Sequence, residues 1–200
     1  MAVTEADALA ALDVADVECG VGAIGAGTGM SCFGFKGGIG SSSRLVRLDR
    51  RDYCVGVLVL ANFGRAGDLR LPDGRRVDPA GVVEAEHGSV IVVAATDVPL
   101  DHRQLRRVIR RAGVGLARVG SFWGNGSGDV FVGFTTANRV PHDSKVDILP
   151  HRSLAEGRID LLFQAMADAT QEAVLDALVA SDTTSGRGHT RIGLRHALKE

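Results

Sequence analysis

Two continuous apolar runs restrict the fold of this sequence more than any other feature. Residues 53–61 (YCVGVLVLA) and Ser89–Thr96 (SVIVVAAT) each have the length of a β-strand, and neither alternates between apolar and polar residues. Such runs are typical of strands that are covered on both faces. A third strand is expected at residues 130–136, and helical patterns follow Asp101 and occupy residues 158–181. Strands that alternate with helices indicate an α/β or layered α+β architecture.

Helix-capping residues define the ends of two further segments. The chain is expected to open with a helix whose N-cap is Thr4, with Asp7 three residues later, and which runs to about residue 15. Asp101 is expected to cap a single helix that ends at Gly120. Arginines surround the apolar face of this helix, and without interleaved aromatic residues they indicate a solvated face rather than a nucleic-acid contact.

Glycine is concentrated in two places, of which the first is the longer. Residues 19–44 hold too many glycines for a helix, so we expect a loop with a short strand whose backbone approaches something closely. Residues 20–25 (GVGAIG) match GxGxxG, but no buried strand precedes them and no helix follows, which argues against dinucleotide binding. Residues 65–86 are predicted to form turns, with a brief strand at residues 69–71.

Composition excludes several classes of function. The 200 residues are 45% apolar with a net charge of −1, which describes one globular domain, residues 1–200, with no overall attraction to nucleic acid or to a membrane surface. The three cysteines and six histidines form no metal-binding pattern, so we expect no metal and no cofactor. Reduced cysteines and the absence of a signal sequence favour a cytoplasmic location.

Nucleophilic catalysis by a serine is a weak signal in the residues alone, because no GxSxG motif and no motif of a serine–histidine–aspartate triad is present. A serine that becomes the N-terminus of a chain can use its own α-amine as the base, because the reference pKa of that amine is about 8. Gly88-Ser89 suits such a cleavage site, since glycine leaves room for the hydroxyl to attack the preceding carbonyl. Taken alone, Ser89 equally fits the start of a strand, and Asn62, Ser127 and Asp129 equally fit local turn contacts.

Four sequence blocks in order resemble the L-aminopeptidase/D-esterase and β-aminopeptidase family. They are residues 25–40 (GAGTGMSCFGFKGGIG), 55–65 (VGVLVLANFGR), 88–97 (GSVIVVAATD) and 124–129 (GNGSGD). The resemblance implies a layered αββα fold and self-cleavage into two subunits that stay together, residues 1–88 and 89–200. It also implies removal of N-terminal amino acids from peptides, amides or esters.

The same resemblance assigns roles to individual residues. Ser89 matches the nucleophile that follows the cleavage site, and Asn62 matches the side chain that helps to hold the oxyanion. Ser127 and Asp129 match the pair that orients the nucleophile and binds an amine. The glycines of the first block are expected to line the substrate site, and they are Gly25, Gly27 and Gly29.

Members of this family are longer at their N-terminus, and the resemblance implies that the additional region supplies part of the sheets and a tyrosine of the site. The expected function is a self-cleaving serine aminopeptidase that forms an acyl-enzyme on Ser89 and assembles as a homo-oligomer of processed heterodimers. The alternative is a catalytically incompetent fragment, or a subunit that needs another chain. Unpaired strand edges and apolar faces would then favour association.

Overall fold

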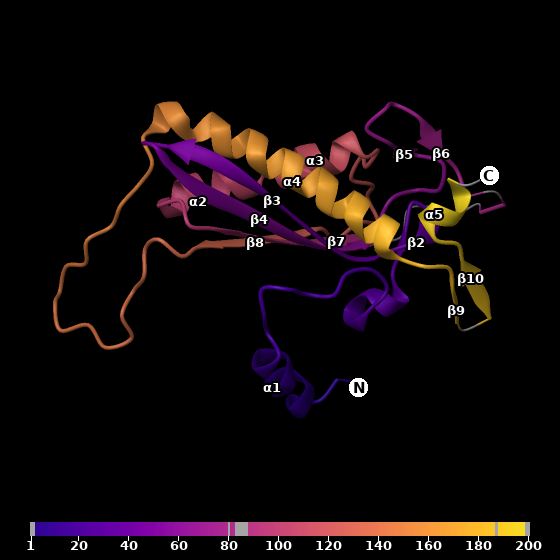
Figure 1. Cartoon of the computed structure of the whole chain (residues 1–200), viewed down its shortest axis with the longest axis horizontal. Coiled ribbons are helices and arrows are strands. Elements are labelled where there is room, and N and C mark those ends of the chain that lie inside the picture. Colours follow the sequence, from indigo (N-terminus) through magenta and orange to yellow (C-terminus); the bar gives the residue numbers. More distant parts are fainter. Residues whose placement is uncertain (1–2, 80, 83–87, 187, 199–200) are drawn as a thin grey trace.

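A computed structural model describes residues 3–79, 81–82, 88–186 and 188–198. Its centre is a four-stranded sheet with helices on one face (Figure 1). The elements are α1 Glu5–Asp13, η1 Gly25–Gly29, β1 Ser31–Cys32, β2 Phe35–Lys36, β3 Gly38–Leu48, β4 Arg51–Asn62, β5 Leu69–Arg70, β6 Arg76–Val77, β7 Ser89–Thr96, α2 His102–Ile109, α3 Ala112–Arg118, β8 Val130–Thr135, η2 Glu156–Arg158, α4 Ile159–Ala180, β9 Thr184–Gly186, β10 His189–Arg191 and α5 Leu194–Ala197.

The connections of the sheet bring distant segments to one end. The strand order is β3-β4-β7-β8, in which β3, β4 and β7 are antiparallel neighbours and β8 runs parallel to β7. Asp49 and Arg50 join β3 to β4 with positive φ angles, as a tight hairpin turn requires. The end of β4 therefore lies beside the start of β7, where the candidate nucleophile is found.

The first glycine-rich segment contains a longer strand than the sequence indicated. Residues 38–44 were expected to be mostly loop, yet they begin the 11-residue strand β3. Helix α4 crosses this strand so closely that a Cβ on Gly40 would lie 2.0 Å from the carbonyl oxygen of Ala173. Close packing of the helix against the strand, rather than a flexible loop, therefore explains this glycine.

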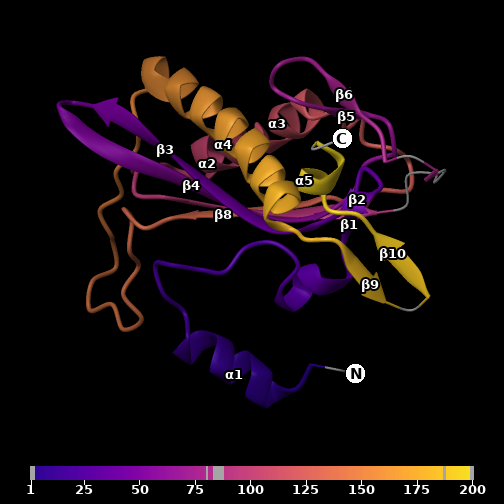
Figure 2. The same cartoon turned by 45° about the vertical axis from the view of Figure 1, so that its right-hand side comes forward.

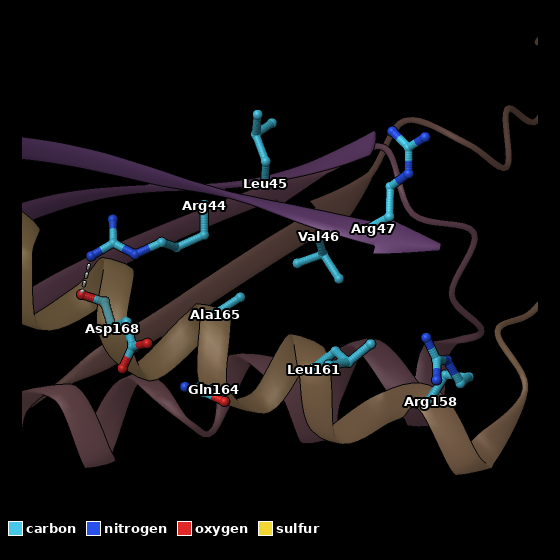
Figure 3. Close-up of a pocket in the computed structure, with 9 residues that line it drawn as sticks. All are labelled: Arg44, Leu45, Val46, Arg47, Arg158, Leu161, Gln164, Ala165 and Asp168. Carbon is cyan, nitrogen blue, oxygen red and sulfur yellow. Dashed lines mark hydrogen bonds between the residues drawn. The ribbon is translucent and has the colours of Figure 1, made fainter. Parts of the chain in front are cut away.

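The prediction that the central strands are covered on both faces is wrong for the described residues. Helices α2, α3 and α4 all lie on one face of the sheet (Figures 1 and 2). Val46 of β3 is buried and points toward the helices, whereas the neighbouring Leu45 points away from them and is exposed (Figure 3). On the open face Leu58 and Ile91 are 37% and 43% exposed. Both strand faces are apolar, which suits a sandwich with a second layer on this open face.

The helices agree with the sequence patterns except at one break. Thr4 caps α1 in a capping box with Asp7, and α4 occupies nearly the whole predicted segment. The expected single helix after Asp101 is two helices, because α2 ends at Ile109 and α3 begins at Ala112. No helix in the described part of the chain is long and apolar enough to cross a membrane.

Candidate active site

The sheet register places Asn62 directly beside Ser89. Asn62 is the last residue of β4, Ser89 is the first residue of β7, and the two are partners in the antiparallel ladder. Both side chains are half-buried, whereas Val90 behind them is fully buried. The candidate nucleophile is thus held at the edge of the core, where it remains accessible.

Gly88 fits where no other residue would. A Cβ at this position would lie 2.0 Å from the carbonyl oxygen of Asn62 and 3.2 Å from the Cα atom of Phe63. The peptide bond between Gly88 and Ser89 is therefore held tightly against the end of β4. The sequence predicted a glycine here to leave room for hydroxyl attack, and the structure adds this close backbone approach as a second reason.

The second glycine-rich turn, residues 124–129, contacts the nucleophile directly. The Gly128 backbone N–H donates a hydrogen bond to Ser89 Oγ at 3.0 Å. Within the turn, Ser127 Oγ donates to Asp129 Oδ1 at 2.6 Å. The same carboxylate oxygen accepts the backbone N–H of Val90 at 3.1 Å, so Asp129 joins the turn to β7. The structure thus brings Ser127 and Asp129 to Ser89, as the resemblance implied, while their chemical roles stay predictions.

The side-chain amide of Asn62 is oriented by the first residue of β1. Its Oδ1 atom accepts the backbone N–H of Ser31 at 3.0 Å. Because one corner of the carboxamide is fixed in this way, the Nδ2 group is turned to the other side as a donor. A neutral amide donor beside a serine is suited to hold a developing oxyanion.

A buried lysine, which the sequence analysis did not identify, binds the backbone around η1 and β1. Lys36 is 2% exposed, and its Nζ donates to the carbonyl oxygens of Gly27, Met30 and Gly37 at 2.7–2.9 Å. Burial lowers the pKa of the Lys36 ammonium. The only sequence signal was one charged residue among apolar residues and glycines, which does not reveal three carbonyl partners.

The three glycines predicted to line the substrate site have different surroundings. All belong to η1, which precedes the β1–β2 hairpin. Gly27 is buried, and a Cβ there would lie 2.5 Å from the Gly22 carbonyl oxygen, so packing explains it. Gly29 lines a cavity together with Ser31 and Lys36, whereas Gly25 is exposed at the start of η1. Their contact with a substrate stays a prediction.

This geometry matches a known family. A model of peptidase family S58 matches residues 1–191. The chain belongs to peptidase family S58. The β-peptidyl aminopeptidase BapA of Sphingosinicella microcystinivorans is 40% identical over 195 residues, which cover 88% of this chain and 49% of that protein. The chain therefore spans about half the length of the curated relatives it matches.

Solved structures share the fold of this chain. The PH0078 protein of Pyrococcus horikoshii OT3 superposes with a TM-score of 0.87 at 42% identity, over 97% of this chain and 55% of that one. The L-aminopeptidase D-Ala-esterase/amidase of Ochrobactrum anthropi gives a TM-score of 0.86 at 37% identity, over 99% of this chain and 58% of that one. The latter is described as a variant of the N-terminal-nucleophile hydrolase fold. The predicted αββα fold is confirmed, and this chain contributes part of it.

A cavity between β3 and α4 lies far from the candidate active site. Its volume is about 340 Å³, and Val46 and Arg44 line it from the strand side (Figure 3). Val46 pairs with Tyr53, nine residues before Asn62 on β4, so this cavity lies roughly 30 Å from Ser89 along the strand. Arg44 of β3 forms an ion pair with Glu172 of α4. This pair joins the strand to the helix, which indicates a contact between two layers of the fold rather than a ligand site.

Proposed function

We propose that this protein is a self-cleaving serine aminopeptidase whose nucleophile is Ser89. One observation carries the proposal: the first residue of β7 is a serine whose Oγ accepts a hydrogen bond from Gly128, beside the bonded pair Ser127 and Asp129. Membership of family S58 supports the same reading. Because the chain spans about half of its relatives, its own activity is part of the proposal.

The first reaction is cleavage of the bond between Gly88 and Ser89. Ser89 Oγ attacks the Gly88 carbonyl carbon, and its proton passes to the leaving nitrogen as the C–N bond breaks. The product is an ester between Gly88 and Ser89 Oγ, which water hydrolyses to a Gly88 carboxylate and a free hydroxyl. Donation from Asn62 Nδ2 to the Gly88 carbonyl oxygen stabilises the negative charge that develops during attack.

The second reaction uses the α-amine that the first one releases. With a reference pKa of about 8, this amine is partly unprotonated at neutral pH and accepts the proton of its own hydroxyl. Ser89 Oγ then attacks the carbonyl of the first substrate residue, the remainder leaves as an amine or alcohol, and water hydrolyses the acyl-enzyme. Asp129 Oδ1 accepts the backbone N–H of Val90, the residue after the nucleophile, and its carboxylate supplies a negative charge for binding an amine.

The activities named for two relatives indicate the class of substrate. One is a β-peptidyl aminopeptidase, and another acts as an L-aminopeptidase and a D-Ala-esterase or amidase. We therefore propose peptides, amino-acid amides and esters with a free N-terminal amine as substrates. Assembly as a homo-oligomer of processed heterodimers, residues 1–88 and 89–200, stays a prediction.

Release of p-nitroaniline from alanyl and β-alanyl p-nitroanilides tests the enzymatic part. We expect the wild-type chain to release the dye and Ser89→Ala to lose release entirely. Ser153→Ala, which changes an exposed serine in the loop before η2, is the matched control and should keep wild-type rates. Equal activity of the wild type and Ser89→Ala would show that another group, or a contaminant, performs the hydrolysis.

The open sheet face favours a second candidate function. Exposed apolar residues occupy one face of the central sheet, among them Leu58, Ile91, Val132 and Phe134. An exposed apolar face of this kind is expected of a subunit whose active site is complete only when another chain covers that face. In that case the purified chain should associate during size-exclusion chromatography and remain uncleaved, whereas a stable cleaved monomer would contradict this candidate.

A further inference from the structure

A groove at the free edge of the central sheet brings apolar and cationic side chains together. It has a volume of about 510 Å³ and lies between α2 and β8, which are side by side (Figures 1 and 2). Its apolar part includes Ile109 of α2 and Phe131 of β8. His102, Arg106 and Arg110 also line it, and their spacing of four residues places them on one face of the helix. Among the described residues that line this groove, none is an aspartate or glutamate.

Helix α2 has a second row of arginines, and that row is already neutralised. Arg103 and Arg107 both form ion pairs with Glu156, which lies in η2. Arg106 and Arg110 of the groove are exposed, and in the described part of the chain their side chains have no hydrogen bond, ion pair or ring contact. The groove therefore offers two guanidinium groups with unused donors, and such groups bind carboxylates through paired hydrogen bonds.

The backbone of β8 has hydrogen-bonding groups that no other described strand uses. Strand β8 is the last strand of the sheet, and among the described strands β7 is its one neighbour. The Thr136 N–H, just after β8, donates to the carbonyl oxygen of Thr96 in β7 at 2.9 Å. Since backbone groups alternate between the two edges of a strand, those of Phe131, Gly133 and Thr135 point away from β7. They form a row of donors and acceptors at a free sheet edge, and such a row binds an added strand.

A strand added at this edge would place its side chains on both faces of the sheet. Successive side chains of a strand point to opposite faces, so every second one would face Arg106 and Arg110 of α2. Two such side chains lie about 7 Å apart along a strand, and two residues four apart on a helix lie about 6 Å apart along its axis. The remaining side chains would lie on the open face beside Val132 and Phe134, which are 51% and 50% exposed. The surface therefore fits a segment in which acidic and apolar residues alternate.

We propose that the edge of β8 binds an extended segment of a partner protein in which acidic and apolar residues alternate. The segment pairs with the backbone of β8, its acidic side chains bind Arg106 and Arg110, and its apolar side chains cover Val132 and Phe134. Pairing of β8 with the β8 of a second copy is disfavoured, because it would bring the arginines of both copies together with no acidic residue of the described groove between them. The proposal does not depend on the function proposed for Ser89.

Fluorescence anisotropy with three labelled peptides tests the sequence pattern of the partner. The peptide VEVEVEV has the alternating pattern, VVEEEVV has the same composition with the acids grouped, and VKVKVKV has the opposite charge. The label is attached at the N-terminus, which leaves no free amine for an aminopeptidase. We expect the full wild-type chain to bind VEVEVEV roughly 10-fold more tightly than VVEEEVV and not to bind VKVKVKV. Equal affinity for VEVEVEV and VVEEEVV, or no binding of VEVEVEV, would overturn the proposal.

Substitutions in α2 test the role of the two arginines. Arg106→Gln and Arg110→Gln should each weaken binding of VEVEVEV by roughly 10-fold, because each removes one charge that faces the peptide. Arg103→Gln is the matched control, since it removes the same charge from the neutralised row of the same helix and should leave the affinity unchanged. Unchanged affinity in the Arg106→Gln, Arg110→Gln double variant, or an equal loss in Arg103→Gln, would overturn the proposal.

Methylation of the peptide backbone tests strand pairing separately from charge. Only alternate N–H groups of an added strand face β8, so methylation of every glutamate nitrogen and methylation of every valine nitrogen remove different hydrogen bonds. We expect one of these two forms of VEVEVEV to lose binding, and retained binding of both would overturn the proposal. Analytical ultracentrifugation of the chain alone tests the other occupant. Concentration-dependent association that is lost in the Arg106→Gln, Arg110→Gln double variant would mean that a second copy occupies the edge, and it would overturn the proposal as well.

Discussion

Gly88→Ala tests the claim that close backbone packing holds the cleavage site. The new Cβ would lie 2.0 Å from the Asn62 carbonyl oxygen, whereas such contacts in proteins essentially never fall below 3.0 Å. The two segments must therefore separate by about 1 Å. A misplacement of that size reduces a reaction between positioned groups roughly 100-fold, and the overpacking should destabilise the fold by about 1–3 kcal/mol.

The rate of self-cleavage follows from intact mass spectra taken at intervals after refolding, and the free energy of unfolding from urea titration. Gly157→Ala is the matched control, because a Cβ at Gly157 meets nothing within 4 Å. This control should process like the wild type and keep its stability. If Gly88→Ala processes within about threefold of the wild type, the packing argument for this glycine is refuted.

Three further substitutions test other parts of the account. Asn62→Ala should slow self-cleavage and substrate hydrolysis by roughly 10²–10³-fold through loss of the oxyanion donor. Both rates are measured in samples quenched at intervals, and rates equal to those of the wild type would contradict that role. Gly40→Ala should destabilise the fold by about 1–3 kcal/mol in urea, because its Cβ would lie 2.0 Å from the Ala173 carbonyl oxygen; an unchanged midpoint would count against tight packing of α4. The Glu156 carboxyl has a pKa lowered to about 2 by hydrogen bonds from α2 side chains, so it stabilises the fold above its ordinary pKa of about 4.5 and loses this effect as the pH falls toward 2. Thermal unfolding of Glu156→Gln should therefore show a smaller decrease in melting temperature between pH 4.5 and 2 than the wild type, and parallel curves would refute the assignment.

Residues whose environment follows from local pattern were predicted well. The run Ser89–Thr96 is a strand with the predicted bounds, since its apolar side chains leave few other conformations in a folded chain. Thr4 and Asp101 cap the helices that follow them, because capping depends on side chains only three residues apart. Of the candidate site, Ser89, Asn62 and the turn at residues 124–129 lie together as the resemblance to the family implied.

Features that depend on distant parts of the chain were not predictable in this way. Lys36 has three carbonyl partners that only the folded loop brings together, so its sequence neighbours gave no sign of them. Gly40 was assigned to a loop, because glycine enrichment alone does not distinguish a flexible segment from a strand pressed against a helix. The break between α2 and α3 was also not predicted; α3 packs closely on α4, where a Cβ on Gly115 would lie 2.5 Å from the Ala167 carbonyl oxygen.

The intact mass of the purified chain, measured beside Ser89→Ala, tests the central claim most directly. The account predicts two fragments in the wild type, residues 1–88 and 89–200, with Ser89 as the N-terminus of the second, and a single uncut chain in Ser89→Ala. One uncut chain in both samples would contradict self-cleavage by these 200 residues and favour the subunit that needs another chain.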